Sequence, residues 1–150
     1  MSHTFSQLWY HIIWSTKNRQ KTISLSIQNR LYSYLGGITK LEGADLIRIN
    51  GIEDHVHLLL KLNPTHCPCD IIRTLKCNSS SWIHETWPEM KGFSWQNGYS
   101  IFTVSHSGID DVIRYIQNQD EHHRRMSFAE ELKKILVKHG VEFLPDHYLD

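Results

Sequence analysis

Two histidines, His55 and His57, stand two residues apart in a mostly apolar run that ends at Leu62. The run is predicted to be a strand, and successive side chains of a strand point to opposite faces of the sheet. His55 and His57 therefore share one face and lie close enough to bind one metal ion. The apolar residues of the other face would pack in the core: Val56, Leu58, Leu60 and Leu62. Because the chain contains eleven histidines, a chance pair of solvated histidines is the alternative.

A second pair of candidate residues, Tyr115 and Gln119, lies in a segment predicted to be helical. Residues four apart occupy the same face of a helix, one turn from each other. The Gln119 amide oxygen can bind a metal ion, and the Tyr115 hydroxyl can act as a nucleophile. The alternative is an ordinary tyrosine at the edge of the core with a hydrogen-bonded hydroxyl.

Basic residues are concentrated early in a chain whose formal net charge is zero. The neutral balance argues against a protein that coats nucleic acid by charge alone. However, residues 1–50 carry six basic and two acidic side chains, and Lys17, Arg19 and Lys21 cluster where the first predicted strand ends. This cluster indicates either a contact with phosphate groups or a solvated loop.

The three cysteines, Cys67, Cys69 and Cys77, match no disulfide framework. Free thiols in a reducing compartment are the expected state. His66, Cys67 and Cys69 resemble half of a zinc site, but the sequence offers no matching second half.

The elements that position these residues follow from apolar periodicity and from capping residues. Strands are expected at residues 8–14, 45–50, 55–62 and 99–104. Helices are expected to begin after Ser24 or Ser26, at a cap formed by Asp70, after Ser107 or Gly108, and at about Phe128, where the last helix runs to about Lys138. The order β-α-β-β-α-β followed by helices predicts an α+β, ferredoxin-like fold, in which two helices cover one face of a four-stranded antiparallel sheet. The other face would serve as an RNA platform, a dimer interface or the floor of an active site.

A chain of 150 residues, with 40% hydrophobic and 21% charged residues, suits a single domain. We expect residues 1–150 to form one domain, with a core at about 5–125 and a helical extension at about 126–150. The longest apolar stretch is too short to cross a bilayer, and no secretory signal is recognisable. The expected location is the cytoplasm, without a membrane partner.

Five sequence blocks occur in order along the chain: LWYHIIWSTKNR at 8–19, GIEDHVHLLL at 51–60, Leu75-Lys76 with Ser79-Ser80, NGYSIFTVS at 97–105 and VIRYIQNQDEHH at 112–123. Together they resemble the smallest insertion-sequence transposases, the single-tyrosine HUH (His-hydrophobic-His) family that includes the REP-associated tyrosine transposases. A lone His-x-His motif is weak evidence, but its combination with the tyrosine block at this distance is specific. The blocks occur in the family's order and span roughly residues 5–125. One departure is Cys77, which follows Leu75 and Lys76 where the family commonly has glycine.

The resemblance implies a role for each matching residue. His55 and His57 would be the metal-binding pair, Gln119 the third ligand and Tyr115 the nucleophile, with Mg²⁺ or Mn²⁺ as the cofactor. The reaction would be metal-assisted transesterification of single-stranded DNA through a 5′-phosphotyrosine intermediate, which needs no ATP. The pair His122 and His123 matches the motif, but we assign it no catalytic role.

The resemblance also implies partners. The DNA would carry hairpins near the ends of a mobile element, and the protein would be a homodimer with composite sites, in which the tyrosine helix of one subunit serves the histidines of the other. The candidates for backbone contacts are Lys17, Arg19, Arg73 and Lys76. Because a phenol is mostly protonated at neutral pH, a base must assist, and Asp54 is the nearest candidate in the sequence.

Three alternatives remain at this point. An RNA-binding RRM has the same order of elements but needs aromatic residues on its central strands, where this chain has histidines. A domesticated relative would handle repetitive hairpins without transposition. A zinc hydrolase would use the histidines with water and without the tyrosine.

Because His57 faces away from the predicted core, we expect its replacement by alanine to abolish cleavage at little cost in stability.

Overall fold

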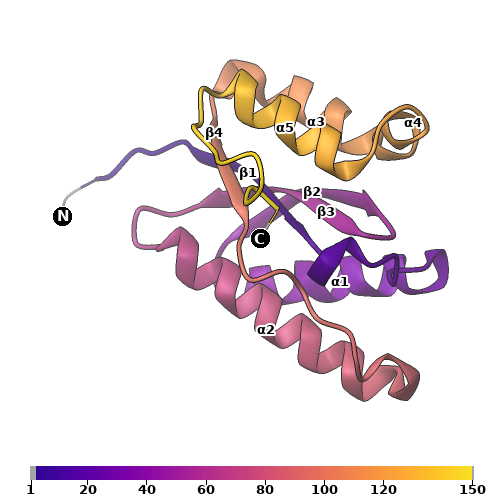
Figure 1. Ribbon diagram of the computed structural model, residues 1–150. Coiled ribbons are helices and arrows are strands. Elements are labelled where there is room, and N and C mark those ends of the chain that lie inside the picture. Colours follow the sequence, from indigo (N-terminus) through magenta and orange to yellow (C-terminus); the bar gives the residue numbers. More distant parts are fainter. Residues whose placement is uncertain (1–2, 150) are drawn as a thin grey trace.

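A four-stranded antiparallel sheet in the order β2-β3-β1-β4 lies at the centre of the computed structural model, which describes residues 3–149 (Figure 1). The strands are β1 (Leu8–Ser15), β2 (Asp45–Ile52), β3 (His55–Leu62) and β4 (Ser100–Val104). This order, with a helix between β1 and β2 and another between β3 and β4, confirms the predicted ferredoxin-like, α+β fold.

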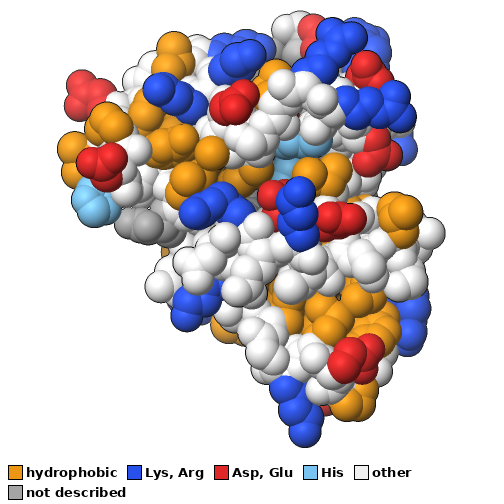
Figure 2. All heavy atoms as spheres, turned by 45° about the vertical axis from the view of Figure 1, so that its right-hand side comes forward, with side chains coloured by type: hydrophobic (Ala, Val, Ile, Leu, Met, Phe, Trp, Pro, Cys, Tyr) orange, Lys and Arg blue, Asp and Glu red, His pale blue; other side chains and the backbone are white. Residues whose placement is uncertain are grey.

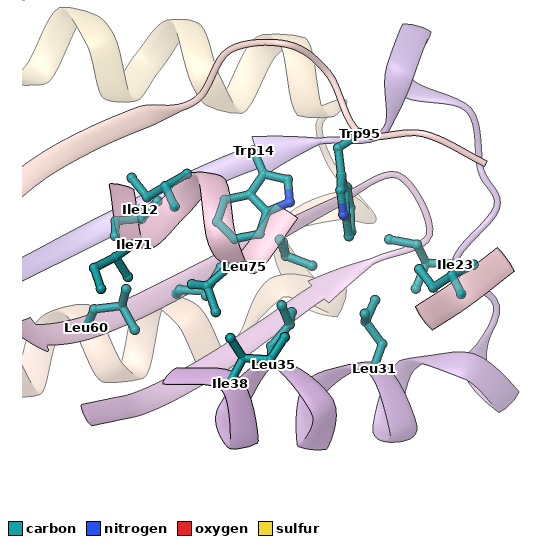
Figure 3. Packing of buried hydrophobic residues seen from close by; sticks show 14 of the residues in the cluster. Ile12, Trp14, Ile23, Leu31, Leu35, Ile38, Leu60, Ile71, Leu75 and Trp95 are labelled. Atoms are coloured by element: carbon teal, nitrogen blue, oxygen red, sulfur yellow. The ribbon is translucent and has the colours of Figure 1, made fainter. Parts of the chain in front are cut away.

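One face of the sheet is covered by α1 (Leu25–Leu41) and α2 (Pro68–Thr86) (Figure 1). Apolar residues recur at helical spacing along α1, at Ile27, Leu31, Leu35 and Ile38, and all of them are buried. They pack against the strands, where Ile12 pairs with Leu58 and Trp14 with Val56 (Figure 3). The alternation predicted for β3 is confirmed, because Val56, Leu58, Leu60 and Leu62 all belong to this core.

The other face of the sheet is covered by α3 (Ile109–Gln117), α4 (Gln119–His123) and α5 (Phe128–Lys138) (Figure 1). A second, smaller apolar cluster joins α5 to this face and consists of Ile13, Phe102, Phe128, Leu132 and Leu136. Cross-strand pairing places Ile13 beside His57 and Ser15 beside His55 on the same face. The two histidines therefore lie between the sheet and a second layer of helices.

Several boundaries differ from the predicted ones. Helix α2 begins at Pro68 rather than after an Asp70 cap, because proline fits the first position of a helix, where its missing N–H costs nothing. The predicted third helix is broken at Asn118, which has φ −96° and ψ 26°. The Asn50 side-chain amide of β2 donates to the carbonyl oxygens of Ile116 and Gln117, which ties the end of α3 to the sheet.

The hairpin between β2 and β3 fixes where His55 lies. A Cβ atom on Gly51 would sit 2.1 Å from the carbonyl oxygen of His55, so only glycine allows this close approach of the two strands. Short 3₁₀ segments at Lys17–Arg19, Pro88–Met90 and His106–Gly108 complete the connections. No helix within residues 3–149 is long and apolar enough to cross a membrane.

Candidate active site

The buried carboxylate of Glu131, on α5, lies where the sheet and the second helical layer meet. The residue is 1% exposed. Its Oε1 atom lies 2.9 Å from Nε2 of His57 and 3.3 Å from Nε2 of His55. Its Oε2 atom accepts a hydrogen bond of 2.5 Å from the Tyr115 hydroxyl. A single side chain thus contacts both predicted metal ligands and the predicted nucleophile.

The two histidines are held in place by partners at their Nδ1 atoms. Nδ1 of His55 lies 2.7 Å from Oδ1 of Asp54, and Nδ1 of His57 lies 2.8 Å from Nε2 of His11. Both rings are fully buried, so their orientation is fixed by packing as well as by these bonds. The Nε2 atoms of both rings consequently point toward the same place, as metal-binding histidines require.

The electrostatics of the cluster differ from one residue to the next. Burial alone would lower the pKa of His55, but its bonds to Asp54 and Glu131 outweigh burial and raise the pKa to about 9. Burial lowers the pKa of His57 to about 4 despite the nearby Glu131. Burial would raise the pKa of Glu131, but hydrogen bonds from His123, His55 and His57 hold it well below its ordinary value. Near neutral pH, Glu131 is therefore an anion next to one charged and one neutral imidazole.

The predicted third ligand, Gln119, reaches the same cluster from α4. Its Oε1 atom lies 2.9 Å from Nε2 of His55, and its Nε2 atom donates to Oε2 of Glu131 at 3.2 Å. His123, one helical turn later, places its Nε2 atom 3.1 Å from Oε1 of Gln119 and 3.2 Å from Oε1 of Glu131. The structure thus brings His123, which had no assigned role, into the cluster.

Tyr115 lies at the open edge of this cluster. Its ring is half-buried, and its centroid lies 5.8 Å from that of His57 and 4.5 Å from that of His122. Burial, followed by the negative charge of Glu131, raises the pKa of the phenol above its ordinary value. An anionic phenolate beside the Glu131 carboxylate is therefore unfavourable unless a positive charge is added to the site.

Within the single chain that the structure describes, Tyr115 lies beside its own histidines, and the composite site that the resemblance implies stays a prediction. The link between β4 and α3 is short, so α3 folds back over the sheet from which it came. The bonds from Asn50 to the end of α3 hold it there. One chain therefore gathers the predicted nucleophile and the three predicted metal ligands in a single cluster.

The donor atoms of the cluster fit a divalent metal ion. One atom each from His55, His57 and Glu131 can be chosen so that all three lie within 4.8 Å of one another. Ligands that surround an ion at about 2.1 Å in octahedral geometry lie about 3 Å apart. The separations of 2.9 Å and 3.3 Å from Glu131 to the two histidines, and of 2.9 Å from Gln119 to His55, are of this size. Mixed nitrogen and oxygen donors suit Mn²⁺, and Mg²⁺ is compatible with the oxygen ligands.

A cavity of about 560 Å³ leads from the surface to Tyr115 and Glu131. Its walls come from β4, α3 and α5 and are mainly apolar, with Lys134, Lys138 and His139 contributed by the end of α5 and the residue after it. In the space-filling view, histidine side chains appear within a recess among apolar and charged side chains (Figure 2). The cavity gives an extended ligand access to the tyrosine while the predicted metal ligands stay buried.

The predicted DNA contacts lie elsewhere. Arg73 and Lys76 line a groove of about 620 Å³ between α2 and residues 94–99. The Lys76 ammonium donates to the carbonyl oxygens of Gln96, Asn97 and Gly98, and burial lowers its pKa to about 8. Lys17 and Arg19 follow β1, and the Lys17 backbone N–H donates to the Ser94 carbonyl beside this groove. Lys17, Arg73 and Lys76 thus lie near residues 94–99, with Arg19 two residues after Lys17 along the chain, and their contact with DNA stays a prediction.

Three residues of the cluster were missed by reasoning from the sequence: Glu131, His11 and His123. Glu131 carried a signal, because it interrupts the apolar stripe of α5 formed by Phe128, Leu132 and Leu136. An acidic residue on the buried face of an amphipathic helix is unusual unless it is paired. His11 carried a weaker signal, since it belongs to a strand and shares a face with Ile13. Asp54, proposed as a base for Tyr115, instead contacts His55 on the ring nitrogen opposite the cluster.

The burial of His57 removes the basis for expecting that its replacement with alanine costs little stability. The ring does face away from the larger core, but α3 and α5 cover that face and leave the ring 0% exposed. Its removal would leave Nε2 of His11 without the partner that lies 2.8 Å away, and would remove one of the hydrogen bonds to the buried Glu131 carboxylate. Buried polar groups that lose a hydrogen bond destabilise a fold.

Comparison with known proteins places the chain in a family. Residues 4–119 match the sequence model described as Transposase IS200 like. The chain is 31% identical over 120 residues to the ISDra2 transposase TnpA of Deinococcus radiodurans, a match that covers 77% of this chain and 86% of that protein. It is 24% identical over 135 residues to the transposase for insertion sequence element IS200 of Salmonella typhimurium, covering 85% and 88% of the two chains.

Solved structures agree with this placement. A transposase from Deinococcus radiodurans superposes with a TM-score of 0.67 at 30% identity, covering 79% of this chain and 95% of that one. A REP-associated tyrosine transposase bound to a REP hairpin superposes with a TM-score of 0.61 at 13% identity, covering 82% and 74%. The second likeness concerns the fold alone. The family match includes His55, His57, Tyr115 and Gln119 but ends before Glu131.

The pair Asp54 and His55 predicts a pH-dependent stability of the metal-free protein. Because the pKa of His55 is raised from 6.5 to about 9, its stabilising charge is fully present below pH 6.5 and is lost as the pH rises through about 9. Below pH 6.5, the free energy of unfolding of Asp54→Asn should be about 1–2 kcal/mol lower than that of the wild type. This difference in the free energy of unfolding should shrink as the pH rises through about 9. Urea denaturation in EDTA, followed by tryptophan fluorescence, measures it.

The matched control for this experiment is Asp45→Asn, which removes an exposed carboxylate at the start of β2. It should change stability little at any pH. A deficit in Asp54→Asn that stays constant across the range would contradict the ion pair as its cause.

Proposed function

The chain belongs to the IS200-like transposase family, and we propose that it cleaves and rejoins single-stranded DNA with Tyr115 as its nucleophile. The observation that carries the proposal is the position of the Tyr115 hydroxyl. It lies between a cavity open to the surface and the cluster formed by His55, His57 and Glu131. A phosphodiester in the cavity would meet the nucleophile at the edge of that cluster.

The proposed step is a transesterification at phosphorus. The Tyr115 oxygen forms a bond to phosphorus while the bond from phosphorus to the 3′ oxygen breaks. The phenol releases one proton and the leaving 3′ oxygen takes up one, so a 5′-phosphotyrosine and a free 3′-OH result. The phosphodiester energy is conserved, and attack by another 3′-OH reverses the step and rejoins the strand.

His55, His57 and Gln119 would hold the divalent ion in this reaction. When bound, the ion supplies positive charge that polarises the phosphate and favours loss of the phenolic proton. Such help is needed because burial and Glu131 raise the pKa of Tyr115. Asp54 and His11 would keep the two imidazoles oriented through their Nδ1 atoms.

We propose that the substrate is a single strand next to a hairpin. A flexible strand can bend so that its scissile phosphate enters a cavity, whereas a stacked duplex resists this deformation. The REP-associated relative of similar fold is bound to a REP hairpin. Lys17, Arg19, Arg73 and Lys76 would contact the backbone outside the catalytic cavity.

The structure favours this reading over an RRM-like RNA-binding module. An RRM presents aromatic residues on an open sheet face, where bases stack on them. Here that face is covered by α3, α4 and α5, and the residues facing them include two buried histidines. A domesticated relative would use the same chemistry, since loss of mobility does not require loss of any residue in the cluster.

The nucleophile is tested by Tyr115→Phe, which removes only the phenolic oxygen. We expect no covalent adduct with single-stranded DNA in the presence of Mn²⁺, while hairpin binding stays within about twofold of wild type. Denaturing gel electrophoresis of labelled DNA measures the adduct, and fluorescence anisotropy measures binding. The matched control is Tyr34→Phe, because Tyr34 stacks on Trp82 away from the site. This variant should keep full activity. A denaturation-resistant adduct in Tyr115→Phe would disprove the assignment.

We further propose that the protein is a homodimer in which each site is complete within one chain. The resemblance implies composite sites, but the contact from Tyr115 to Glu131 within one chain supports assembly in cis. Dimers containing one His57→Asn and one Tyr115→Phe subunit should therefore stay inactive. Co-expression with two different tags isolates these mixed dimers, and the adduct assay measures them.

The composite arrangement predicts a different result for the same dimers. Each mixed dimer would then have one intact site of its two, so purified mixed dimers would recover about half of wild-type activity. Recovery at this level would establish that Tyr115 of one subunit acts with the histidines of the other subunit. Asparagine replaces His57 because a polar side chain is less disruptive at a buried position, and circular dichroism verifies that the subunits are folded.

A further inference from the structure

Glu131 lies on α5, which packs against the sheet face that carries His55 and His57. The family match covers residues 4–119, so it ends at Gln119 and leaves α5 outside. Yet α5 is firmly attached to the sheet: Phe128 stacks on His55 at 4.3 Å, and Leu132 and Leu136 pack in the smaller apolar cluster. The Ser127 hydroxyl caps the helix by accepting from the Glu130 backbone N–H. The Glu131 carboxylate is thereby fixed between the histidines and the tyrosine.

We propose that Glu131 is a catalytic residue, binding the divalent ion through Oε1 and holding the Tyr115 hydroxyl through Oε2. The inference rests on the proposed function of Tyr115. Each oxygen has its own set of contacts. Oε1 lies near the Nε2 atoms of His55, His57 and His123, and Oε2 accepts from Tyr115 and Gln119. The two ends of one carboxylate would thus fix the distance between ion and nucleophile.

The chemistry of the ligand set supports a carboxylate at this place. Two imidazoles and one amide are neutral ligands, whereas Mg²⁺ and Mn²⁺ are hard ions that favour carboxylate oxygen. Glu131 supplies such an oxygen at 2.9 Å from His57, the spacing of neighbouring ligands. It also supplies the negative charge that balances part of the charge of the ion in a buried site.

The fold alone does not call for a glutamate at position 131. The residue lies in an apolar stripe, between Phe128 and Leu132, where an aliphatic side chain would pack well. Burying a carboxylate costs free energy that its hydrogen bonds only offset. A role in binding the ion and orienting the tyrosine explains why this position carries a charge, and why the charge meets five polar side chains in one cluster.

The matched pair of variants is Glu131→Gln and Glu130→Gln, which make the same change at adjacent buried and exposed positions of α5. Mn²⁺ is titrated into metal-free protein and followed by electron paramagnetic resonance of the free ion. Adduct formation with single-stranded DNA is then measured at saturating Mn²⁺. We expect Glu131→Gln to bind Mn²⁺ at least about tenfold more weakly and to form the adduct more slowly even at saturation. Glu130→Gln should match wild type in both.

The outcomes separate the inference from the proposed function. Wild-type Mn²⁺ affinity in Glu131→Gln would overturn the ligand role, and a wild-type adduct rate at saturation would overturn the role at Tyr115. Faster adduct formation in Glu131→Gln would also overturn the proposal, because Glu131 would then block the site. Weakened Mn²⁺ binding in Glu131→Gln, with no adduct in wild type, would support the ligand role and count against the proposed function.

A further variant covers the case in which Glu131→Gln does not fold. Glu131→Asp keeps the charge but retracts the carboxylate by one methylene, so it cannot contact the ligands and Tyr115 with the same spacing. We expect weaker Mn²⁺ binding and a slower adduct rate than wild type. Wild-type values for both in a folded Glu131→Asp protein would overturn the proposal.

Discussion

The buried Glu131 carboxylate is the interaction on which the arrangement of this site depends. It contacts His57 from β3, Tyr115 from α3 and His123 from α4, so it connects the sheet to all three helices of the second layer. A buried charge is tolerated only when hydrogen bonds surround it, and here they do. The same contacts that satisfy the charge bring the candidate nucleophile and the candidate ligands within reach of one another.

The sheet on one side and the helices on the other hold Glu131 and the residues that it contacts in place. On the sheet, the close approach at Gly51 and the side chains of Asp54 and His11 fix the two imidazoles. On the helices, Asn50 holds the end of α3, and the apolar stripe of α5 fixes the height of its carboxylate above the sheet. The larger core, between the sheet and helices α1 and α2, supports the sheet that carries the histidines. The smaller apolar cluster positions α5 and its carboxylate.

Reasoning from the sequence predicted the fold and four residues that the structure gathers, because their signals are local. Alternation in β3 placed His55 and His57 on one face, and the four-residue spacing placed Tyr115 and Gln119 together, although Asn118 interrupts the helix between them. Glu131 and His11 were missed because their significance depends on contacts between distant segments. Nothing in the periodicity of α5 says which face of the sheet it covers. The burial of His57 was missed for the same reason, since it depends on where α3 and α5 pack.

Anomalous diffraction can show whether His55, His57 and Glu131 bind one divalent ion beside Tyr115. Crystals of the full chain grown with Mn²⁺ would be measured at a wavelength where manganese scatters anomalously. We expect a peak at bonding distance, about 2–2.5 Å, from Nε2 of both histidines and Oε1 of Glu131. A strong peak at other residues, or an ion on the two histidines with Glu131 turned away from it, would show that these three residues do not form one metal site.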